Sequence, residues 1–245
     1  MKKGFIAVID SGIGGLSVLK RLVGELPNED YVYFSDSKNM PYGNRTERDL
    51  YKLTLDNILR LKSNFNLKAV VLGCNTLSMT IRGRLEQELK IKVFGVFPPL
   101  ILSKDKKTLL LSTERTANEY KKYNLNAQVK ILPTLAKRIE DSAPDFSRVD
   151  VKSLLPYKKG EFDNVILGCT HYDFVKNEIF DHLKPRRIFC GQDFTVNFIK
   201  NYYQNRKSLD KIYLNQVLFF GDYLKINEKV WSLVVENVKL YDKKV

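Results

Sequence analysis

Apolar, largely β-branched residues gather in short runs along this chain, and polar residues and a helix-like stretch follow each run. Such alternation is typical of βαβ units that build a parallel sheet. Four runs fall in the first half and four in the second: residues 5–9, 31–34, 69–72 and 92–96, then 108–111, 128–132, 164–167 and 186–189. One more run covers 217–220, and helical periodicity returns over 227–238. The pattern predicts an α/β fold.

The two halves also match in the residues that end one of their strands. The sequence AVVLGCNT at 69–76 and the sequence NVILGCTH at 164–171 share a strand, then Leu-Gly-Cys, then a short polar cap. Their spacing is too long for a solenoid, so it predicts a duplicated domain. Two similar parallel-sheet α/β domains related by pseudo-two-fold symmetry would place Cys74 and Cys169 face to face across a cleft. Pro98 and Pro99 supply the strongest break between the halves.

Composition narrows the class of protein. With 245 residues, 44% of them hydrophobic and 28% charged, the chain is typical of a globular protein. No apolar stretch approaches the length of a membrane span, and no cleavage site follows the N-terminal apolar run, so we expect a cytoplasmic protein. Three cysteines and two histidines provide neither a disulfide framework nor a zinc ligand set, and we expect no metal.

The charge balance is strongly basic, with a formal net charge of +13. Its lysines are scattered through the helical segments rather than gathered on one of them. This charge favours the capture of anionic partners, and both a dicarboxylate and a nucleic acid meet that description. Charge alone does not choose between them.

Polar residues that directly follow strands are the first candidates for a site, because ligands bind outside the carboxyl ends of parallel strands. Four strand ends carry such residues: Asp10-Ser11, Asp36-Ser37, Cys74-Asn75-Thr76 and Cys169-Thr170-His171. The glycine-rich turn at 11–15 would present free backbone amides to a carboxylate. A nucleotide is less favoured, because Ser17 stands where the dinucleotide fingerprint has its third glycine.

Each candidate also has a purely structural interpretation. Asp10 can be an N-cap of the next helix, and Asp36 and Ser37 admit the same reading. Pro41-Tyr42-Gly43 forms a turn whose exposed ring and amides can equally line a pocket.

The cysteines carry the main chemical hypothesis. A single buried thiol is usually structural, but Cys74 and Cys169 both precede a predicted helix N-terminus, where the dipole and free amides lower a thiol pKa. Cys190 lies inside the run 188–192 and is assigned to packing. His171 follows Cys169 at a polar strand end, which favours a role in proton transfer. Two thiols on opposite walls can take a proton from one face of a carbon and deliver one to the other.

With these motifs, the sequence resembles the glutamate racemases of the aspartate/glutamate racemase superfamily. The matching stretches are IAVIDSGIGGLSVLKRL (6–22), FSDSKNMPYGNRT (34–46), VVLGCNT (70–76), STERT (112–116) and VILGCTHYDF (165–174). The resemblance implies that Cys74 deprotonates D-glutamate with help from Asp10. It implies that Cys169 deprotonates L-glutamate with help from His171 and Glu140. The other expected substrate-binding residues are Ser11, Asp36, Ser37, Pro41, Tyr42, Gly43, Asn75, Thr76, Thr116 and Thr170.

The resemblance also implies a domain division, partners and a role. A first domain would comprise residues 1–97 together with a returning segment 208–245, and a second would comprise 98–207. The resemblance implies that no cofactor is needed, that the substrate is glutamate and that the protein forms a homodimer. The product D-glutamate would serve peptidoglycan synthesis.

Three departures from the family pattern stand out. Leu132-Pro133 replaces a Cys-Pro pair, so the alignment of Glu140 depends on its spacing from Pro133. Asp173 replaces a proline after CTHY, and the chain is shorter than usual.

Two other functions remain open from the residues alone. A racemase of aspartate or of another small acid would share the motifs around the α-carbon. A nucleic-acid-binding protein is the alternative of another class, although no zinc ligand set, aromatic RNA-binding motif or basic helix supports it.

Overall fold

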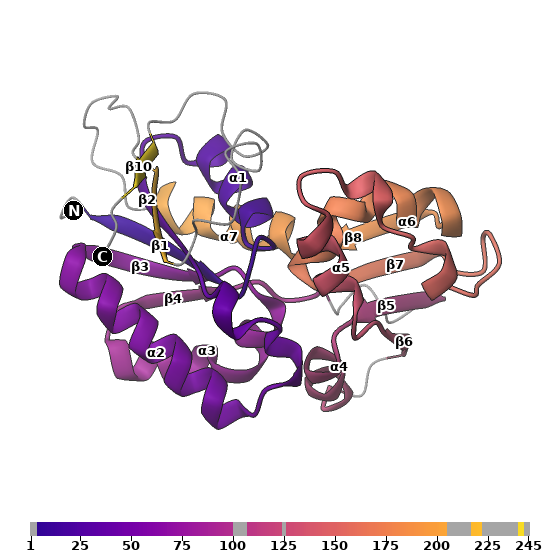
Figure 1. The fold of residues 1–245 in the computed structure, drawn as a ribbon, viewed down its shortest axis with the longest axis horizontal. Coiled ribbons are helices and arrows are strands. Elements are labelled where there is room, and N and C mark those ends of the chain that lie inside the picture. Colours follow the sequence, from indigo (N-terminus) through magenta and orange to yellow (C-terminus); the bar gives the residue numbers. More distant parts are fainter. Residues whose placement is uncertain (1–3, 100–106, 124–125, 205–216, 222–239, 243–245) are drawn as a thin grey trace.

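The computed structural model describes residues 4–99, 107–123, 126–204, 217–221 and 240–242, which form two wholly parallel sheets (Figure 1). The first sheet has the order β10-β9-β2-β1-β3-β4, and the second has the order β6-β5-β7-β8. The strands of the first are β1 (Phe5–Asp10), β2 (Asp30–Ser35), β3 (Leu67–Leu72), β4 (Lys92–Gly95), β9 (Val217–Gly221) and β10 (Leu240–Asp242). Those of the second are β5 (Thr108–Ser112), β6 (Ala127–Ile131), β7 (Asn164–Gly168) and β8 (Arg187–Cys190).

The predicted duplication is visible in the strand order. Strands β2-β1-β3-β4 follow one another as β6-β5-β7-β8 do, so β1 corresponds to β5 and β3 to β7. The prediction of two similar parallel-sheet α/β domains is confirmed, with strand ends that differ by one or two residues. The runs were continuously apolar because central strands such as β1 and β3 are covered on both faces.

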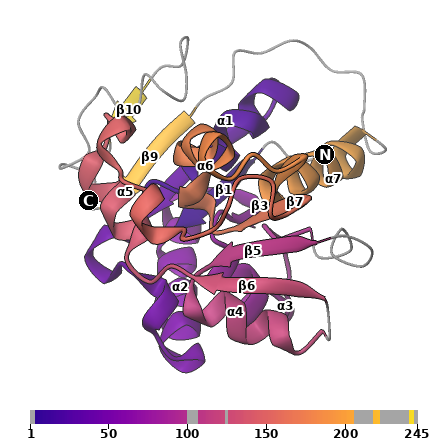
Figure 2. The same cartoon turned by 90° about the vertical axis from the view of Figure 1, so that its right-hand side faces the viewer.

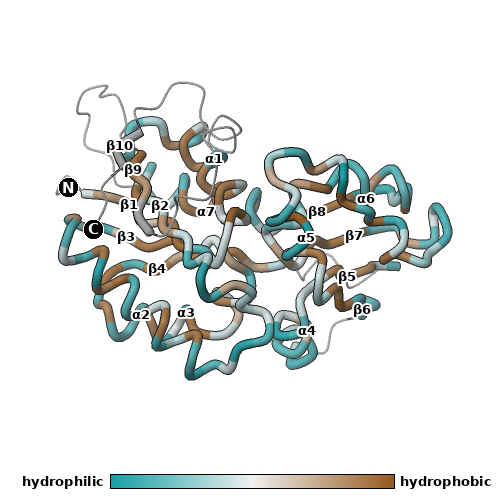
Figure 3. Tube along the Cα trace, viewed as in Figure 1, coloured by the Kyte–Doolittle hydropathy of each residue, from teal (hydrophilic) through white to brown (hydrophobic). Residues whose placement is uncertain are grey.

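Helices cover both faces of each sheet. They are α1 (Leu16–Glu25), α2 (Glu47–Asn64), α3 (Asn75–Leu89), α4 (Glu114–Lys121), α5 (Leu135–Ser142), α6 (Lys176–Leu183) and α7 (Gly191–Gln204). Helices α2 and α3 lie on one face of the first sheet, with α1 and α7 on the other (Figure 1). In the second half, α5 and α6 lie opposite α4 (Figure 2). The apolar strands lie inside, and hydrophilic helix surfaces face outward (Figure 3).

Local sequence signals fix two of the helix starts that matter for the site. Thr46 caps α2 by accepting a hydrogen bond from the Asp49 amide, at 3.1 Å. Thr113 caps α4 by accepting one from the Thr116 amide, at 3.4 Å. Both are the side chain to backbone bonds that satisfy the free amides of a helix N-terminus.

Segments beyond β8 pack on the first half. Strand β9 pairs in parallel with β2, and β10 pairs with β9. Helix α7 contacts α1 and β4 of the first half, although the predicted second domain extends to 207. The domain boundaries themselves stay a prediction, and the predicted helix at 227–238 lies outside the described residues.

Short 3₁₀ helices occupy the connections: η1 (Ser37–Asn39), η2 (Tyr42–Asn44), η4 (Phe146–Arg148), η5 (Lys152–Leu154) and η6 (Thr170–Val175). Within the described ranges, no helix combines the length and apolar character that crossing a membrane requires.

Candidate active site

The site begins where the strands of the two halves end. Strand β1 ends at Asp10, and its neighbour β3 ends two residues before Cys74. In the second half β5 ends at Ser112, and its neighbour β7 ends directly before Cys169. Because the carboxyl ends of neighbouring parallel strands share one edge of a sheet, each cysteine lies beside the end of the central strand of its own half.

Cys74 is the residue before α3, and its side chain is buried. Burial raises the pKa of the Cys74 thiol well above its ordinary value, and the negative charge of Asp10 adds to this effect. Backbone amides at the start of α3 act in the opposite direction. The prediction that the helix N-terminus lowers this pKa is therefore wrong for Cys74, because the loss of solvation outweighs the dipole and the amides.

Asp10 has no contact with solvent. Its Oδ2 accepts hydrogen bonds from the amides of Gly12, at 3.3 Å, and Gly15, at 2.8 Å. Its Oδ1 is buried without a hydrogen-bond partner among the described residues. Burial raises the pKa of Asp10, against the lowering effects of His171 and the Gly15 amide. Asp10 thus binds amides of the turn ahead of α1, although the N-cap residue of α1 is Gly15 and not Asp10.

Three of the five backbone amides in the glycine-rich turn bind carboxylates of the protein itself. Two of them are bound by Asp10, and the Ile13 amide donates to Oε2 of Glu140 at 2.9 Å. The turn does bind carboxylates, but they belong to the protein. Since Glu140 comes from α5, this bond joins the two halves.

Three side chains form a connected chain beside the second cysteine. Sγ of Cys169 lies 3.9 Å from Nδ1 of His171, and Nε2 of His171 lies 3.0 Å from Oε2 of Glu140. His171 is almost fully buried. Burial by itself lowers the pKa of His171, but its bonds to Cys169 and Glu140 raise that pKa well above the ordinary value. His171 and Glu140, identified by different arguments in the sequence, thus lie together next to Cys169.

Threonine hydroxyls form another contact between the two halves. Oγ1 of Thr76 lies 3.2 Å from that of Thr113 and 3.5 Å from that of Thr116. Thr113 was not predicted as a site residue. It directly follows β5, as Ser11 follows β1, so the strand-end rule was sufficient to find it.

The loop after β2 brings the Pro41-Tyr42-Gly43 turn next to this contact. A Cβ added at Gly43 would lie 3.0 Å from Cβ of Thr113. The ring of Tyr42 is buried, so the prediction of an exposed ring is wrong. The Tyr42 hydroxyl donates a short hydrogen bond to Asp36, which also accepts from Asn39. These bonds explain the burial, because they satisfy the hydroxyl away from water.

The remaining predicted residues also lie at the strand ends. Ser11 and Thr170 are buried, and Ser37 bonds to Ser35 through its hydroxyl at 2.9 Å. Nδ2 of Asn75 donates to the carbonyl of Val96 at 3.0 Å, while its Oδ1 has no partner among the described residues. The described part of the chain holds no group of three or more histidine, cysteine or acidic side chains arranged for a metal ion.

Cys190 is buried, as predicted, but its position relative to the next helix differs from the prediction. Strand β8 ends at Cys190 and α7 begins at the next residue, so this cysteine also precedes a helix, contrary to the sequence prediction. Its thiol donates to Oδ2 of Asp193 at 3.0 Å. Burial, with a contribution from the charge of Asp173, raises the pKa of Cys190 to about 12. Such a thiol is a poor nucleophile and a weak acid at neutral pH.

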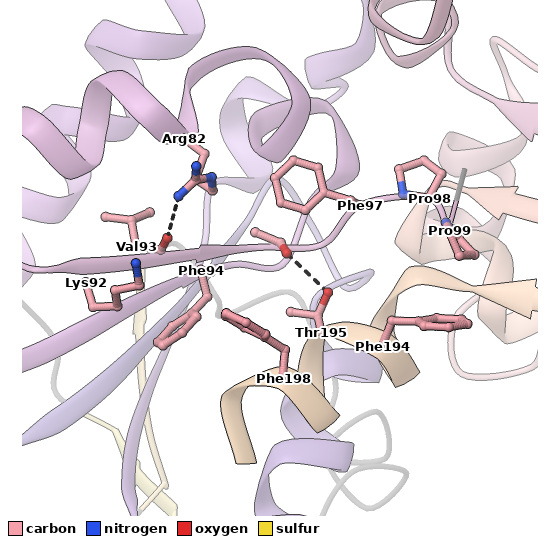
Figure 4. A pocket seen from close by; sticks show the side chains of 11 residues that line it. Arg82, Lys92, Val93, Phe94, Phe97, Pro98, Pro99, Phe194, Thr195 and Phe198 are labelled. Carbon is pink, nitrogen blue, oxygen red and sulfur yellow. Dashed lines mark hydrogen bonds between the residues drawn. The ribbon is translucent and has the colours of Figure 1, made fainter. Parts of the chain in front are cut away.

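A separate pocket of about 520 Å³ lies between β4, the segment that leaves it and α7 (Figure 4). Phe97, Phe194 and Phe198 form much of its wall, and Thr195 donates to the carbonyl of Gly95 at 3.1 Å. None of the predicted site residues line this pocket. It is therefore distinct from the cluster around the two cysteines.

Comparison with known proteins agrees with this geometry. No protein-family model matches the chain. The glutamate racemase of Clostridium acetobutylicum is 35% identical, over 82% of this chain and 84% of that protein. The crystal structure of glutamate racemase isoform RacE1 from Bacillus anthracis has a TM-score of 0.84 at 28% identity, covering 100% of this chain and 99% of the other. Glutamate racemase from Thermus thermophilus in complex with beta-chloro-D-alanine gives 0.81 at 25% identity, covering 99% and 98%. The resemblance expected from the motifs is confirmed, and the chain belongs to the glutamate racemase family.

Proposed function

We propose that this protein interconverts L- and D-glutamate without a cofactor, using Cys74 and Cys169 as two acid/base groups on opposite faces of the α-carbon. The observation that carries the proposal is the pair of buried thiols at equivalent strand ends of the two halves. Each thiol has its own ionisable neighbour, Asp10 for Cys74 and His171 for Cys169.

The proton balance of the reaction is simple. One cysteine acts as a thiolate and takes the α-proton, so that the electron pair of the broken C–H bond stays on the α-carbon. The other cysteine, as a thiol, gives its proton to the opposite face of that carbon. The substrate is inverted, one thiol and one thiolate remain, and their roles are exchanged for the reverse direction.

The surroundings of the two sulfurs favour a defined resting state. Burial and the neighbouring Asp10 disfavour a thiolate at Cys74. The neighbour of Cys169 is instead His171, whose Nδ1 lies 3.9 Å from the sulfur and whose Nε2 contacts Glu140. With its proton on Cys74, the enzyme would take the α-proton of L-glutamate through Cys169.

Polar groups around the thiols are suited to an amino acid with two carboxylates. Oδ1 of Asp10 and Oδ1 of Asn75 are acceptors that fit the ammonium group. The hydroxyls of Thr76, Thr116 and Thr170 are donors that fit the carboxylates, with Ser11 and the Pro41-Tyr42-Gly43 turn as further neighbours. The net charge of +13 favours diffusion of glutamate, whose two carboxylates and one ammonium leave it negatively charged, toward the protein.

The direct test follows circular dichroism of L-glutamate, and separately of D-glutamate, with purified protein and no added pyridoxal phosphate. We expect both to converge on the racemic mixture. Cys74→Ala and Cys169→Ala should each abolish inversion, while Cys190→Ala keeps near wild-type turnover. Folded protein that leaves both enantiomers unchanged would overturn the proposal, and faster turnover of aspartate would reassign the substrate.

A biological role and an assembly belong to the same proposal. The product D-glutamate would serve peptidoglycan synthesis in the cytoplasm, and complementation of a bacterial strain that requires D-glutamate tests this role. The protein would act as a homodimer, which light scattering after gel filtration tests directly.

A further inference from the structure

The side chain of Arg21 connects the two halves behind the site. On α1, its Nη1 and Nη2 bind both carboxylate oxygens of Asp173, at 2.9 and 3.2 Å. Its Nε binds Asp193 of α7 at 2.7 Å, and Nη1 also donates to the carbonyl of Ser17 at 2.8 Å. The guanidinium thus makes its two-pronged contact with η6 of the second half and also contacts Sγ of Cys190 at the end of β8, at 3.8 Å, while its remaining bonds hold it to α7 and α1.

Burial distinguishes this ion pair from an ordinary surface pair. The Asp173 side chain is 12% exposed and that of Arg21 is 26% exposed. Burial by itself lowers the pKa of Arg21, but the bond and the charge of Asp173 raise it above the ordinary value. A two-pronged, largely buried pair holds geometry far better than an exposed one.

Asp173 lies on the same short element as the groups beside Cys169. Helix η6 starts directly after Cys169, carries His171 in its first turn and Asp173 two residues later. Six residues of 3₁₀ helix are too few to hold their own orientation, because their hydrogen bonds are few and poorly aligned. The external contacts of η6 therefore set where His171 points.

Helix α1 supplies such contacts at two places. Gln192 bridges the Ser17 hydroxyl, at 3.1 Å, and the Thr170 carbonyl, at 3.4 Å. Arg21 grips Asp173 one helical turn farther along α1. The start of α1 follows the turn that Asp10 holds, so these two contacts fix η6 relative to the Cys74 side of the site.

We infer that Arg21 and Asp173 form a positioning pair that holds His171 and Cys169 in place for proton transfer. This inference rests on the proposed function. The pair touches neither thiol and takes no proton. Its effect is to keep η6 against α1, and it was not visible in the sequence, where Asp173 was noted only as a departure from the family pattern.

The test is a double-mutant cycle with Arg21→Gln, Asp173→Asn and the double variant. Each single change should lower kcat/KM by about tenfold, since a displacement below 1 Å suffices for such a loss. The double variant should lose no more than the worse single variant, because all three lack the same contact. Lys200→Gln is the matched control. It removes the ion pair between Nζ of Lys200 on α7 and Oε2 of Glu25 on α1, which are 2.6 Å apart, and leaves η6 unchanged. It should keep wild-type activity.

Isotope effects separate positioning from a general loss of folded enzyme. With glutamate deuterated at the α-carbon, slower transfer at Cys169 should raise the isotope effect on kcat/KM for L-glutamate and reduce it for D-glutamate. A loss of folded protein leaves both ratios unchanged. The inference would be overturned by isotope effects equal to those of the wild-type protein, by losses of kcat/KM that add up in the double variant, or by wild-type activity in the single variants. Failure of the wild-type protein to racemise glutamate would instead overturn the proposed function.

Discussion

Gly14 is the position where one added methyl group tests the closed arrangement of the halves most directly. A Cβ built on Gly14 would lie 2.4 Å from Nδ1 of His171 and 2.6 Å from Oγ1 of Thr170. Ordinary contacts of a Cβ begin at 3.4 Å, so the Gly14→Ala variant must move His171 by about 1 Å. Both neighbours are buried, which leaves them no free direction to move.

The expected loss of activity exceeds the expected loss of stability. Overpacking of a buried contact costs about 1–3 kcal/mol of unfolding free energy. The halves can relieve the clash by separating slightly, but this moves His171 away from the first half and breaks the bond between the Ile13 amide and Glu140. Misplacement of a catalytic group by about 1 Å costs roughly a hundredfold in rate. We therefore expect Gly14→Ala to lower kcat/KM about a hundredfold for both enantiomers.

Two other glycines provide matched controls. A Cβ added at Gly24 of α1 or at Gly83 of α3 would meet nothing within 4 Å. Alanine is favoured over glycine in a helix by up to about 1 kcal/mol, so Gly24→Ala and Gly83→Ala should keep activity and raise Tm. Circular dichroism follows racemisation, and thermal unfolding gives Tm. Wild-type kcat/KM in a folded Gly14→Ala variant would refute the close packing of the turn on His171.

Three further substitutions probe the charges and hydrogen bonds of the site. Asp10→Asn should raise the unfolding free energy at pH 7 and lower activity, because the pKa of Asp10 is raised and the stability of the wild-type protein therefore falls as pH rises through that pKa. Urea titrations should show the difference in unfolding free energy between variant and wild type becoming smaller toward pH 3.8. A difference that does not change with pH would contradict this. Glu140→Gln should lower the unfolding free energy most at or below about pH 6.5, where His171 is protonated in both the folded and the unfolded protein. The difference from wild type should become smaller as pH rises through the raised pKa of His171. A difference that stays constant in urea titrations would contradict this. Tyr42→Phe should cost about 1–3 kcal/mol, since the Asp36 carboxylate loses a buried donor, and an unchanged Tm would refute that role.

The strands were predictable because their environment is simple. A strand covered on both faces needs apolar residues along its whole length. The strands at 5–9 and 164–167 can therefore be predicted from their own residues alone. The strand-end rule then located Asp10, Cys74 and Cys169 at the edges of the sheets. Both signals depend on residues close together in sequence.

Contacts between the halves escaped prediction for the opposite reason. The Ile13 amide and Glu140 are separated by 127 residues, and nothing in the glycine-rich turn identifies its partner. Arg21 and Asp173 are separated by 152 residues, and the residues around each likewise do not indicate its partner. The sequence predicts a lowered pKa for Cys74 because a helix N-terminus can be recognised from local residues. The raised pKa results from burial, which depends on the packing of the whole chain.

The duplicated fold does not produce two equivalent thiols, and the difference begins at the ends of β1 and β5. Asp10 ends β1, whereas the corresponding β5 ends in the neutral Ser112. Burial and the negative charge of Asp10 raise the pKa of Cys74. The neighbour of Cys169 is instead His171, which contacts Glu140 through its other ring nitrogen. A two-base reaction needs one thiol and one thiolate, because one sulfur must take a proton while the other gives one. On the proposed mechanism, the unequal neighbours distinguish the cysteine that holds its proton, Cys74, from the cysteine that takes the α-proton of L-glutamate.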